Sequence, residues 1–184
     1  MINNSNMKLI NILKNTFRIK FSAKKEAVDK LVSVSTPDGD FLILLLLSVL
    51  IITVGLILDN IFLVIGGMMV TPLLYPVLAT GLGIAISDWQ LLNRSLGSFI
   101  SSCVIAITSS FVLAEFFFSV TEVSTAMIKN IEPRPAYFVI AIMAGVAATI
   151  TWVRPTLSAA LPGVGVTATL VPPLATSGIS LAIG

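Results

Sequence analysis

The sequence predicts an all-α, polytopic helical membrane protein with two inverted repeats of about three helices each and an interrupted second helix in each repeat. The first observation is composition: 56% of the 184 residues are hydrophobic, 11% are charged and the mean hydropathy is +1.02. Soluble domains carry about 25% charged residues. The second observation is a series of apolar stretches as long as a bilayer span. The third is a motif of glycine, threonine and proline that occurs twice.

Apolar stretches of roughly twenty residues are long enough to cross a hydrocarbon layer of about 30 Å. We expect five such spans, at residues 41–58, 61–86, 97–118, 137–153 and 157–184. The second span is interrupted by "GGMMVTPLLYPVLATG", at 66–81. The fifth is interrupted by Pro162, Pro172 and Pro173.

A helix-start pattern, "STPDGD", precedes the first span. It predicts Ser35 or Thr36 as the N-cap and Pro37 at the first helical position, with Asp38 and Asp40 in the first turn. The membrane domain therefore begins at about residue 36.

The chain divides into three predicted parts: a basic N-terminal segment at 1–35, a first membrane repeat at 36–118, and a second, incomplete repeat at 132–184. Seven of the eleven Lys and Arg residues precede the first span: Lys8, Lys14, Arg18, Lys20, Lys24, Lys25 and Lys30. The positive-inside rule then predicts a cytoplasmic N-terminus in the inner (plasma) membrane. Alternating spans place Arg94 and Arg154 inside, and Lys129 and Arg134 outside.

The basic segment has two open interpretations. In "MKLINILKNTFRIKF", residues Leu9, Ile12 or Leu13, and Phe17 have helical spacing among basic side chains. They fit an interfacial helix on anionic lipid headgroups. The alternative is a solvated basic tail that only sets topology. A cleavable signal peptide is not expected, because the segment is mostly polar and lacks a short apolar core.

The repeat appears when the sequence is shifted by 96 positions. Residues 67–80 then fall on 163–176 with eight identities in fourteen positions, where about one or two are expected by chance. The identical positions form the pattern G-x-x-V-T-x-x-L-x-P-x-L-A-T. The same shift lays 41–58 over 137–154. Because the copies are offset by three spans, equivalent segments are expected to cross the bilayer in opposite directions.

Inverted repeats around interrupted helices are typical of secondary transporters, whose two broken segments meet near the bilayer midplane. Unwound backbone persists in a membrane only inside protein or beside water. Proline frees a carbonyl one turn earlier. We therefore expect the threonines to coordinate a solute or ion and the prolines to hold the backbone open, at Thr71, Pro72, Pro76, Thr80, Thr167, Pro172, Pro173 and Thr176. The competing interpretation is ordinary helix packing, since small residues and Pro are common in membrane helices.

The sequence has few residues or motifs suited to catalysis or to binding a metal or cofactor. The chain has no His and a single Cys, Cys103, which we interpret as a packing residue. Its acidic residues fall in loops or near span ends, and nucleotide, paired-carboxylate and metal-ligand motifs are missing. The sequence therefore predicts a protein that is not an enzyme, with no cofactor, metal or nucleic-acid partner.

Two functions stay open. The first is a transporter or channel for a small solute or ion at the paired broken helices, in a homo-oligomer because so few spans bury little interior. The second is a non-transporting membrane scaffold or sensor that binds lipid or a cytoplasmic partner through the basic segment.

The sequence also resembles a known family, the uncharacterised hydrophobic membrane domain called domain of unknown function 389. The resemblance rests on "TPDGDFLILLLLSVLIITVGLILDN", "VIGGMMVTPLLYPVLATGLGIAISDWQLLNRSL" and "LSAALPGVGVTATLVPPLATSGISLAIG". It covers residues 35–184 and implies a prokaryotic multi-pass inner-membrane protein whose biochemical role is not established. Members of this family usually continue with another span. The counterpart of 97–118 is expected at 193–214, so we expect the second repeat to be truncated at Gly184.

Overall fold

The computed structural model describes residues 28–29, 31, 38–118, 123–132, 135–153 and 160–183. The described part of the chain is helical apart from short connections, and it contains no strand. Its elements are α3 (Gly39–Ile57), α4 (Ile61–Val70), α5 (Leu74–Ile86), α6 (Trp89–Leu113), the π-helical turn η1 (Ala114–Phe118), α7 (Thr125–Ile131), α8 (Pro135–Val153) and α9 (Ala160–Ile183). The basic segment lies almost entirely outside the described residues.

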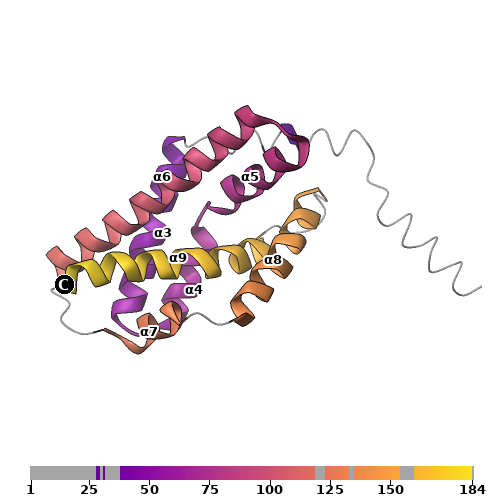
Figure 1. The fold of residues 1–184 in the computed structure, drawn as a ribbon. Coiled ribbons are helices and arrows are strands. Elements are labelled where there is room, and N and C mark those ends of the chain that lie inside the picture. The colour runs from indigo at the N-terminus through magenta and orange to yellow at the C-terminus, as the bar shows by residue number, and fades with distance from the viewer. Residues whose placement is uncertain are drawn as a thin grey trace, which may run out of the picture.

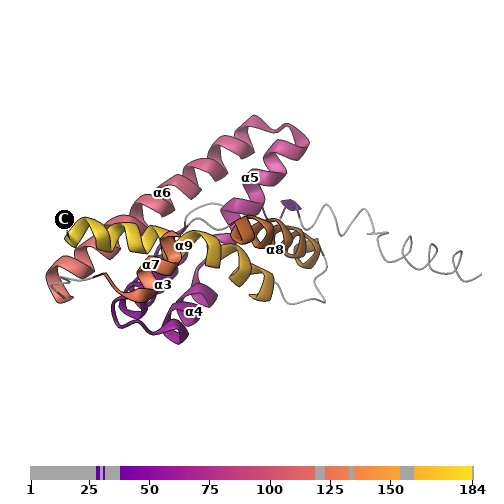
Figure 2. The same cartoon turned by 60° about the horizontal axis from the view of Figure 1, so that its bottom comes forward.

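Helix α9 runs through the middle of the bundle and contacts most of the other helices (Figure 1). The turned view separates α5 and α6 on one side of α9 from α3, α4 and α7 on the other (Figure 2). The main core forms where α3 meets α9, and it includes Leu45, Val49 and Ile52 of α3 and Val171 and Ile179 of α9. A central α9 means that the second copy of the repeated motif is surrounded by protein.

Helix α3 forms as predicted but begins later than the cap pattern indicates. Its N-cap is Asp38, with extended backbone, and the helix starts at Gly39 with Asp40 in its first turn. The predicted caps at 35–36 and Pro37 lie outside the described residues. Because a cap is defined by where helical backbone begins, the placement of Asp38 within the first turn was wrong.

The predicted second span is broken, as expected. Helices α4 and α5 meet at a bend of 54° around Thr71–Leu73. Asn60 caps α4 by accepting from the N–H groups of Phe62 at 3.0 Å and Leu63 at 3.4 Å. Asp88 caps α6 in the same way, accepting from Gln90 and Leu91, both at 3.0 Å.

Helix α6 packs through a stripe of small residues. Its buried positions from the second turn onward are Ser95, Ser98, Ser102, Ala106 and Ser110, spaced three or four apart and therefore on one face. Small side chains allow close backbone approach between helices in membranes. The approach is visible at Gly178 of α9, where an added Cβ would meet the Ile107 carbonyl and lie 2.8 Å from Ser110 Cβ.

A short helix that the sequence did not predict, α7, lies against the end of α3. The Ser124 hydroxyl donates to the Leu56 carbonyl at 2.6 Å, and the Ala126 N–H donates to Asp59 Oδ1 at 2.7 Å. Asp59 has φ 52°, in the left-handed region. These bonds fix the α3–α4 turn to the connection that leads into α8.

Helices α3 and α8 have the same length, 19 residues, and their bounds differ by 96 at each end. This spacing agrees with the sequence repeat. The predicted interruption of the fifth span is wrong, however, because α9 continues through Pro172 and Pro173 over 24 residues. Prolines are tolerated inside membrane helices where neighbouring groups satisfy the freed backbone, and α9 is enclosed by other helices.

Among the described residues, four helices are long and apolar enough to cross a membrane, or up to five if the bent α4–α5 pair forms one span. They are compatible with the predicted membrane protein. Helix α8 differs from the rest, since only 6% of its most apolar window is buried, against 44% for α3. Most of its exposed side chains are apolar, as expected for a surface that meets lipid or another helix.

Candidate functional site

The site begins at the C-terminal end of α4, where the helix stops at a threonine–proline pair. Thr71 is the C-cap with extended backbone, φ −66° and ψ 123°, and its hydroxyl donates to the Gly67 carbonyl at 3.0 Å. Proline at position 72 has no N–H, so the Met68 carbonyl loses the donor that an uninterrupted helix would supply. Both Thr71 and Pro72 are buried.

The second copy of the motif supplies a partner for that carbonyl. The hydroxyl of Thr167, which is 1% exposed, donates to the Met68 carbonyl at 3.2 Å across 99 residues of sequence. Thr167 is also the repeat counterpart of Thr71. The structure therefore brings the two copies together, and we call Gly67, Met68, Thr71, Pro72 and Thr167 the crossing.

Thr80 lies at a different interface. Its hydroxyl donates to the Pro76 carbonyl at 2.7 Å and to Ser95 Oγ at 3.2 Å. Ser95 belongs to α6, so this bond joins α5 to α6. Thr80 was predicted as part of the same site, and its hydrogen bonds indicate a packing role between α5 and α6.

The four predicted prolines act differently. Pro76 is the third residue of α5, where the N–H it lacks has no intrahelical acceptor. The Pro72 carbonyl accepts from the Tyr75 N–H at 3.3 Å, and the Val77 N–H donates to the Leu73 carbonyl at 3.4 Å. Pro76 therefore lies in the first turn of α5 and does not interrupt a helix. Pro72 lies in the break between α4 and α5.

Pro172 and Pro173 lie inside α9 and do not break it. One turn later is Thr176, 1% exposed. Its Oγ1 is the only buried side-chain nitrogen or oxygen of the described residues that lacks a hydrogen-bond partner. An unpaired buried hydroxyl costs about 1–3 kcal/mol.

The interior of the described part is mainly apolar, and its buried polar side chains are uncharged. Every buried polar side chain in the described part of the chain is Ser or Thr: Ser48, Thr53, Thr71, Ser95, Ser98, Ser102, Ser110, Thr167 and Thr176. Within the same residues, His, Cys, Asp and Glu form no group of three that would hold a metal ion. The crossing consequently offers neutral hydroxyl and carbonyl oxygens.

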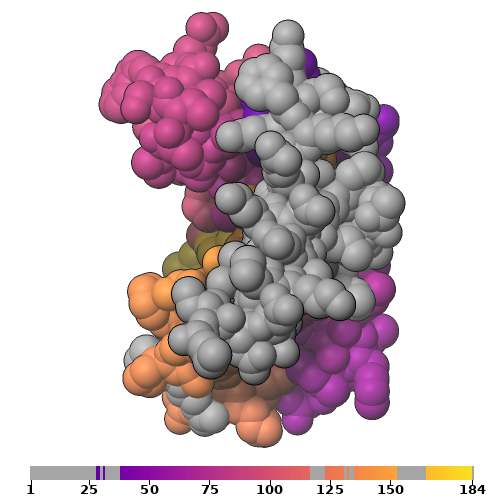
Figure 3. Space-filling view, turned by 90° about the vertical axis from the view of Figure 1, so that its right-hand side faces the viewer, coloured from indigo at the N-terminus to yellow at the C-terminus, as the bar shows by residue number. Residues whose placement is uncertain are grey.

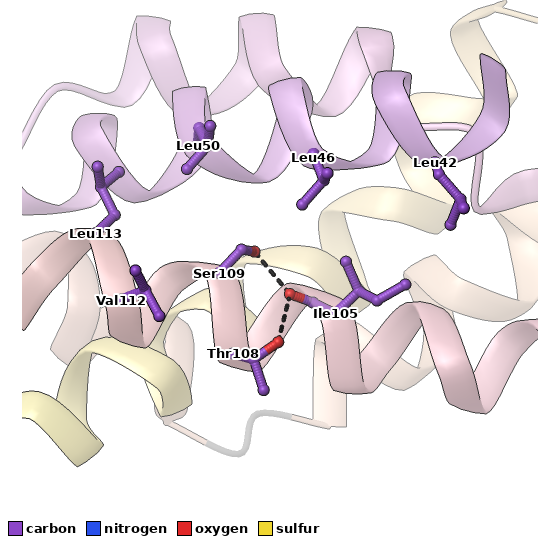
Figure 4. Close-up of a pocket in the computed structure, with 8 residues that line it drawn as sticks. All are labelled: Leu42, Leu46, Leu50, Ile105, Thr108, Ser109, Val112 and Leu113. Atoms are coloured by element: carbon purple, nitrogen blue, oxygen red, sulfur yellow. Dashed lines mark hydrogen bonds between the residues drawn. The ribbon is translucent and has the colours of Figure 1, made fainter. Parts of the chain in front are cut away.

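A groove elsewhere in the structure does not compete with the crossing as a polar site. It has a volume of about 580 Å³, lies between α3 and α6, and is lined by Leu42, Leu46, Leu50, Ile105, Thr108, Ser109, Val112 and Leu113. Figure 4 shows its two hydroxyls directed to the Ile105 carbonyl, at 3.2 Å from Thr108 and 2.6 Å from Ser109. The groove therefore presents an apolar surface.

The surface near α9 is hollowed on one side. In Figure 3 the α5–α6 end and α8 form separate bulges, with α9 seen between them. Tyr75 of α5 and Trp152 of α8 meet edge to face with ring centroids 5.6 Å apart. This aromatic pair joins the start of α5 to the end of α8.

Sequence reasoning missed two members of the crossing, Gly67 and Met68, because both act through backbone carbonyls. A signal for Met68 was present, since it lies four residues before Pro72 and must lose its helical donor. Its pairing with Thr167 required knowledge of which helices touch.

These features define an all-helical protein whose apolar helices are those expected of a membrane protein, with one broken span held against a central helix. The chain belongs to the DUF389 family: residues 68–184 match the family model described as "Domain of unknown function (DUF389)". The resemblance noted in the sequence is thereby confirmed.

A curated relative is consistent with this assignment. The chain is 28% identical over 143 residues to "Uncharacterized protein MJ0678" of Methanocaldococcus jannaschii. The alignment covers 78% of this chain and 44% of the relative, so the chain spans less than half the length of that protein. No solved structure matches the chain significantly.

Proposed function

We propose that the protein is a transporter or channel for a small solute or ion and that the solute passes the crossing of α4 and α9. The observation that carries the proposal is the Thr167 hydroxyl on the Met68 carbonyl, 3.2 Å apart. Irregular backbone at membrane depth is tolerated where it is buried in protein or lines a water-filled cavity. A helix end placed against the repeat-related helix is an arrangement that transporters use for binding.

The repeat supports a mechanism of alternating access. Two halves of opposite orientation around one site would expose the crossing to each side in turn. We propose this opposite orientation from the odd number of spans between copies, together with an inner-membrane location and a cytoplasmic N-terminus. The exposed apolar surface of α8 supports association of several copies.

The neutral oxygens determine how the crossing would act on a solute. A hydroxyl both donates and accepts, so Thr71 and Thr167 suit a small polar molecule or a dehydrated cation. Displacing the Thr167 hydroxyl from Met68 would leave a carbonyl free to accept or coordinate. The crossing thus has a paired state without solute and an open state with solute.

The test is solute flux in proteoliposomes, with panels of inorganic ions, carboxylates and amino acids. Thr167→Val and Thr71→Val are expected to lose flux while remaining folded and inserted. The matched control is Thr149→Val, because Thr149 is an exposed α8 residue whose hydroxyl bonds its own helix at Gly145, 2.9 Å away. Normal flux in both crossing variants would refute the site.

The competing scaffold function makes the opposite prediction. The scaffold function requires the basic segment and does not depend on the crossing. The scaffold function would replace the proposed function if no solute showed flux and if deletion of residues 1–30 abolished activity while the spans stayed intact. The protein would then act by binding lipid or a partner.

A further inference from the structure

The two copies of the repeated motif have different backbone structures. The first copy is broken, because α4 ends at Val70 and α5 begins at Leu74. The second copy lies within the continuous helix α9. A shift of 96 residues lays Ala168 on Pro72, so the second copy has no proline at the position of the break. Alanine is the best helix former and proline the worst, and this difference lets α9 continue where the first copy stops.

The continuous form of α9 leaves two backbone carbonyls without their helical donors. Pro172 and Pro173 have no N–H, and these groups would have bonded the carbonyls of Ala168 and Thr169. The proline rings also press against those two carbonyls, which favours a kink or a break. One turn further on, the hydroxyl of Thr176 is buried and unpaired. The middle of α9 therefore carries several features that weaken a continuous helix.

The broken form of the first copy supplies partners for the equivalent groups. The Pro72 carbonyl, which corresponds to that of Ala168, accepts from the Tyr75 N–H at 3.3 Å. The hydroxyl of Thr80, which corresponds to that of Thr176, makes two hydrogen bonds. Both groups are thus satisfied in the copy of the motif that is broken.

A break at residues 167–169 would place both prolines of α9 in the first turn of a shorter helix. Applying the 96-residue shift to α5 starts this helix at Leu170 and makes Pro172 its third residue, the position that proline occupies in α5. The N–H of a third residue has no intrahelical acceptor, so proline there removes no hydrogen bond. Thr169 would be the N-cap, a position that threonine favours and that Leu73 holds in the first copy. The second copy therefore suits the broken form at its cap and in its first turn.

We infer that α9 is a conformational switch that alternates between the continuous helix and a form broken at residues 167–169. The inference rests on the proposed function and deepens it, because the break includes Thr167, whose hydroxyl donates to the Met68 carbonyl at 3.2 Å. Unwinding at this point moves Thr167 away from Met68 and opens the crossing. The first copy, which Pro72 keeps broken, is the stationary side of the site.

Opposite substitutions separate the two forms. Pro172→Ala combined with Pro173→Ala restores two helical donors and favours the continuous form. Ala168→Pro copies Pro72 and favours the broken form. Both variants are expected to lose flux in proteoliposomes, because each holds the switch in one form.

The switch itself is measured by hydrogen–deuterium exchange of the full chain in nanodiscs, with mass spectrometry that resolves single amides. The N–H groups of Thr169 and Leu170 lose their helical acceptors in the broken form, whereas that of Leu174 keeps its acceptor within the shorter helix. In the native protein we expect the first two amides to exchange roughly tenfold or more faster than that of Leu174. The double alanine variant should slow them, and Ala168→Pro should speed them.

The matched control is Ala147→Pro, because Ala147 is a half-buried alanine inside α8 as Ala168 is inside α9. Proline in a helix with a single form should lower the Tm by roughly 6–12 °C, and Ala168→Pro should lower it by less than half as much. Equal losses of Tm in the two variants would overturn the inference. Exchange at Thr169 as slow as at Leu174 in the native protein would overturn it as well.

The proposed function has a separate readout in flux. Flux that depends on Thr167, together with slow exchange at Thr169, would overturn the switch and leave transport standing. Fast exchange at Thr169 that the double alanine variant abolishes, in a protein without flux, would support the switch and refute transport.

Discussion

Replacing Gly67 by alanine should separate α4 from α3 and weaken the crossing. A Cβ at this position would lie 2.5 Å from Ile52 Cγ1, 2.9 Å from the Ser48 carbonyl oxygen and 3.2 Å from the Ile52 nitrogen. The first atom belongs to a side chain that can rotate, but the other two are α3 backbone. The new methyl group is therefore accommodated only if α4 moves away from α3.

The size of the effect follows from that movement. Restoring ordinary contact with the Ser48 oxygen needs a shift of about 0.5 Å, and gaps of 0.5–1 Å forfeit a quarter to a half of the dispersion energy of the contacts involved. Overpacked cores lose about 1–3 kcal/mol. For a chain of this length, each kcal/mol lowers Tm by roughly 2–4 °C.

The neighbouring glycine provides the control. A Cβ on Gly66 would have nothing within 4 Å, so Gly66→Ala should change stability by less than about 0.5 kcal/mol or increase it through helix propensity of up to about 1 kcal/mol. The assay is thermal unfolding in detergent, followed by flux in proteoliposomes. Equal Tm values for the two variants would refute the close packing of α3 on α4.

Three further predictions concern side-chain hydrogen bonds. Thr167→Val should lower the free energy of unfolding by about 1–3 kcal/mol, because it leaves the buried Met68 carbonyl without its hydroxyl partner. Unfolding in detergent measures this loss. The loss should be smaller for Thr169→Val, because the Thr169 hydroxyl bonds the Val166 carbonyl of its own helix at 2.8 Å. Asn60→Ala should cost about 1 kcal/mol by removing the cap of α4, and an unchanged Tm would contradict that cap. A double-mutant cycle of Thr53→Val with Ser110→Ala should give a coupling of about 0.6 kcal/mol for their 2.9 Å hydrogen bond between α3 and α6, whereas additive losses would show that the bond contributes nothing.

Much of the fold could be predicted from local sequence. The apolar runs predicted the long helices, and the Thr71–Pro72 pair predicted the break, because a proline that removes a helical donor acts on its own chain regardless of what surrounds it. The 96-residue repeat predicted that Thr71 and Thr167 would share one neighbourhood. Their helices do meet, at the Met68 carbonyl.

The errors arise where neighbouring helices determine the result. Pro172 and Pro173 carry the same local signal as Pro72, yet α9 continues through them, since enclosure by other helices stabilises a helix against proline. Thr80 matches Thr176 in the repeat, but only Thr80 lies beside Ser95. The sequence pattern could not distinguish these two threonines, because their difference lies in the facing helix.

The central claim is that the crossing of α4 and α9 is reached by water, as a transport site must be. Cys103 is the only cysteine, so its replacement by serine allows single thiols to be introduced and treated with a membrane-impermeant reagent in proteoliposomes. We predict that Thr71→Cys, buried in the structure, reacts and that Val146→Cys, 57% exposed on the apolar α8, does not. Reaction at Val146 with none at Thr71 would show a dry, packed crossing and contradict the account.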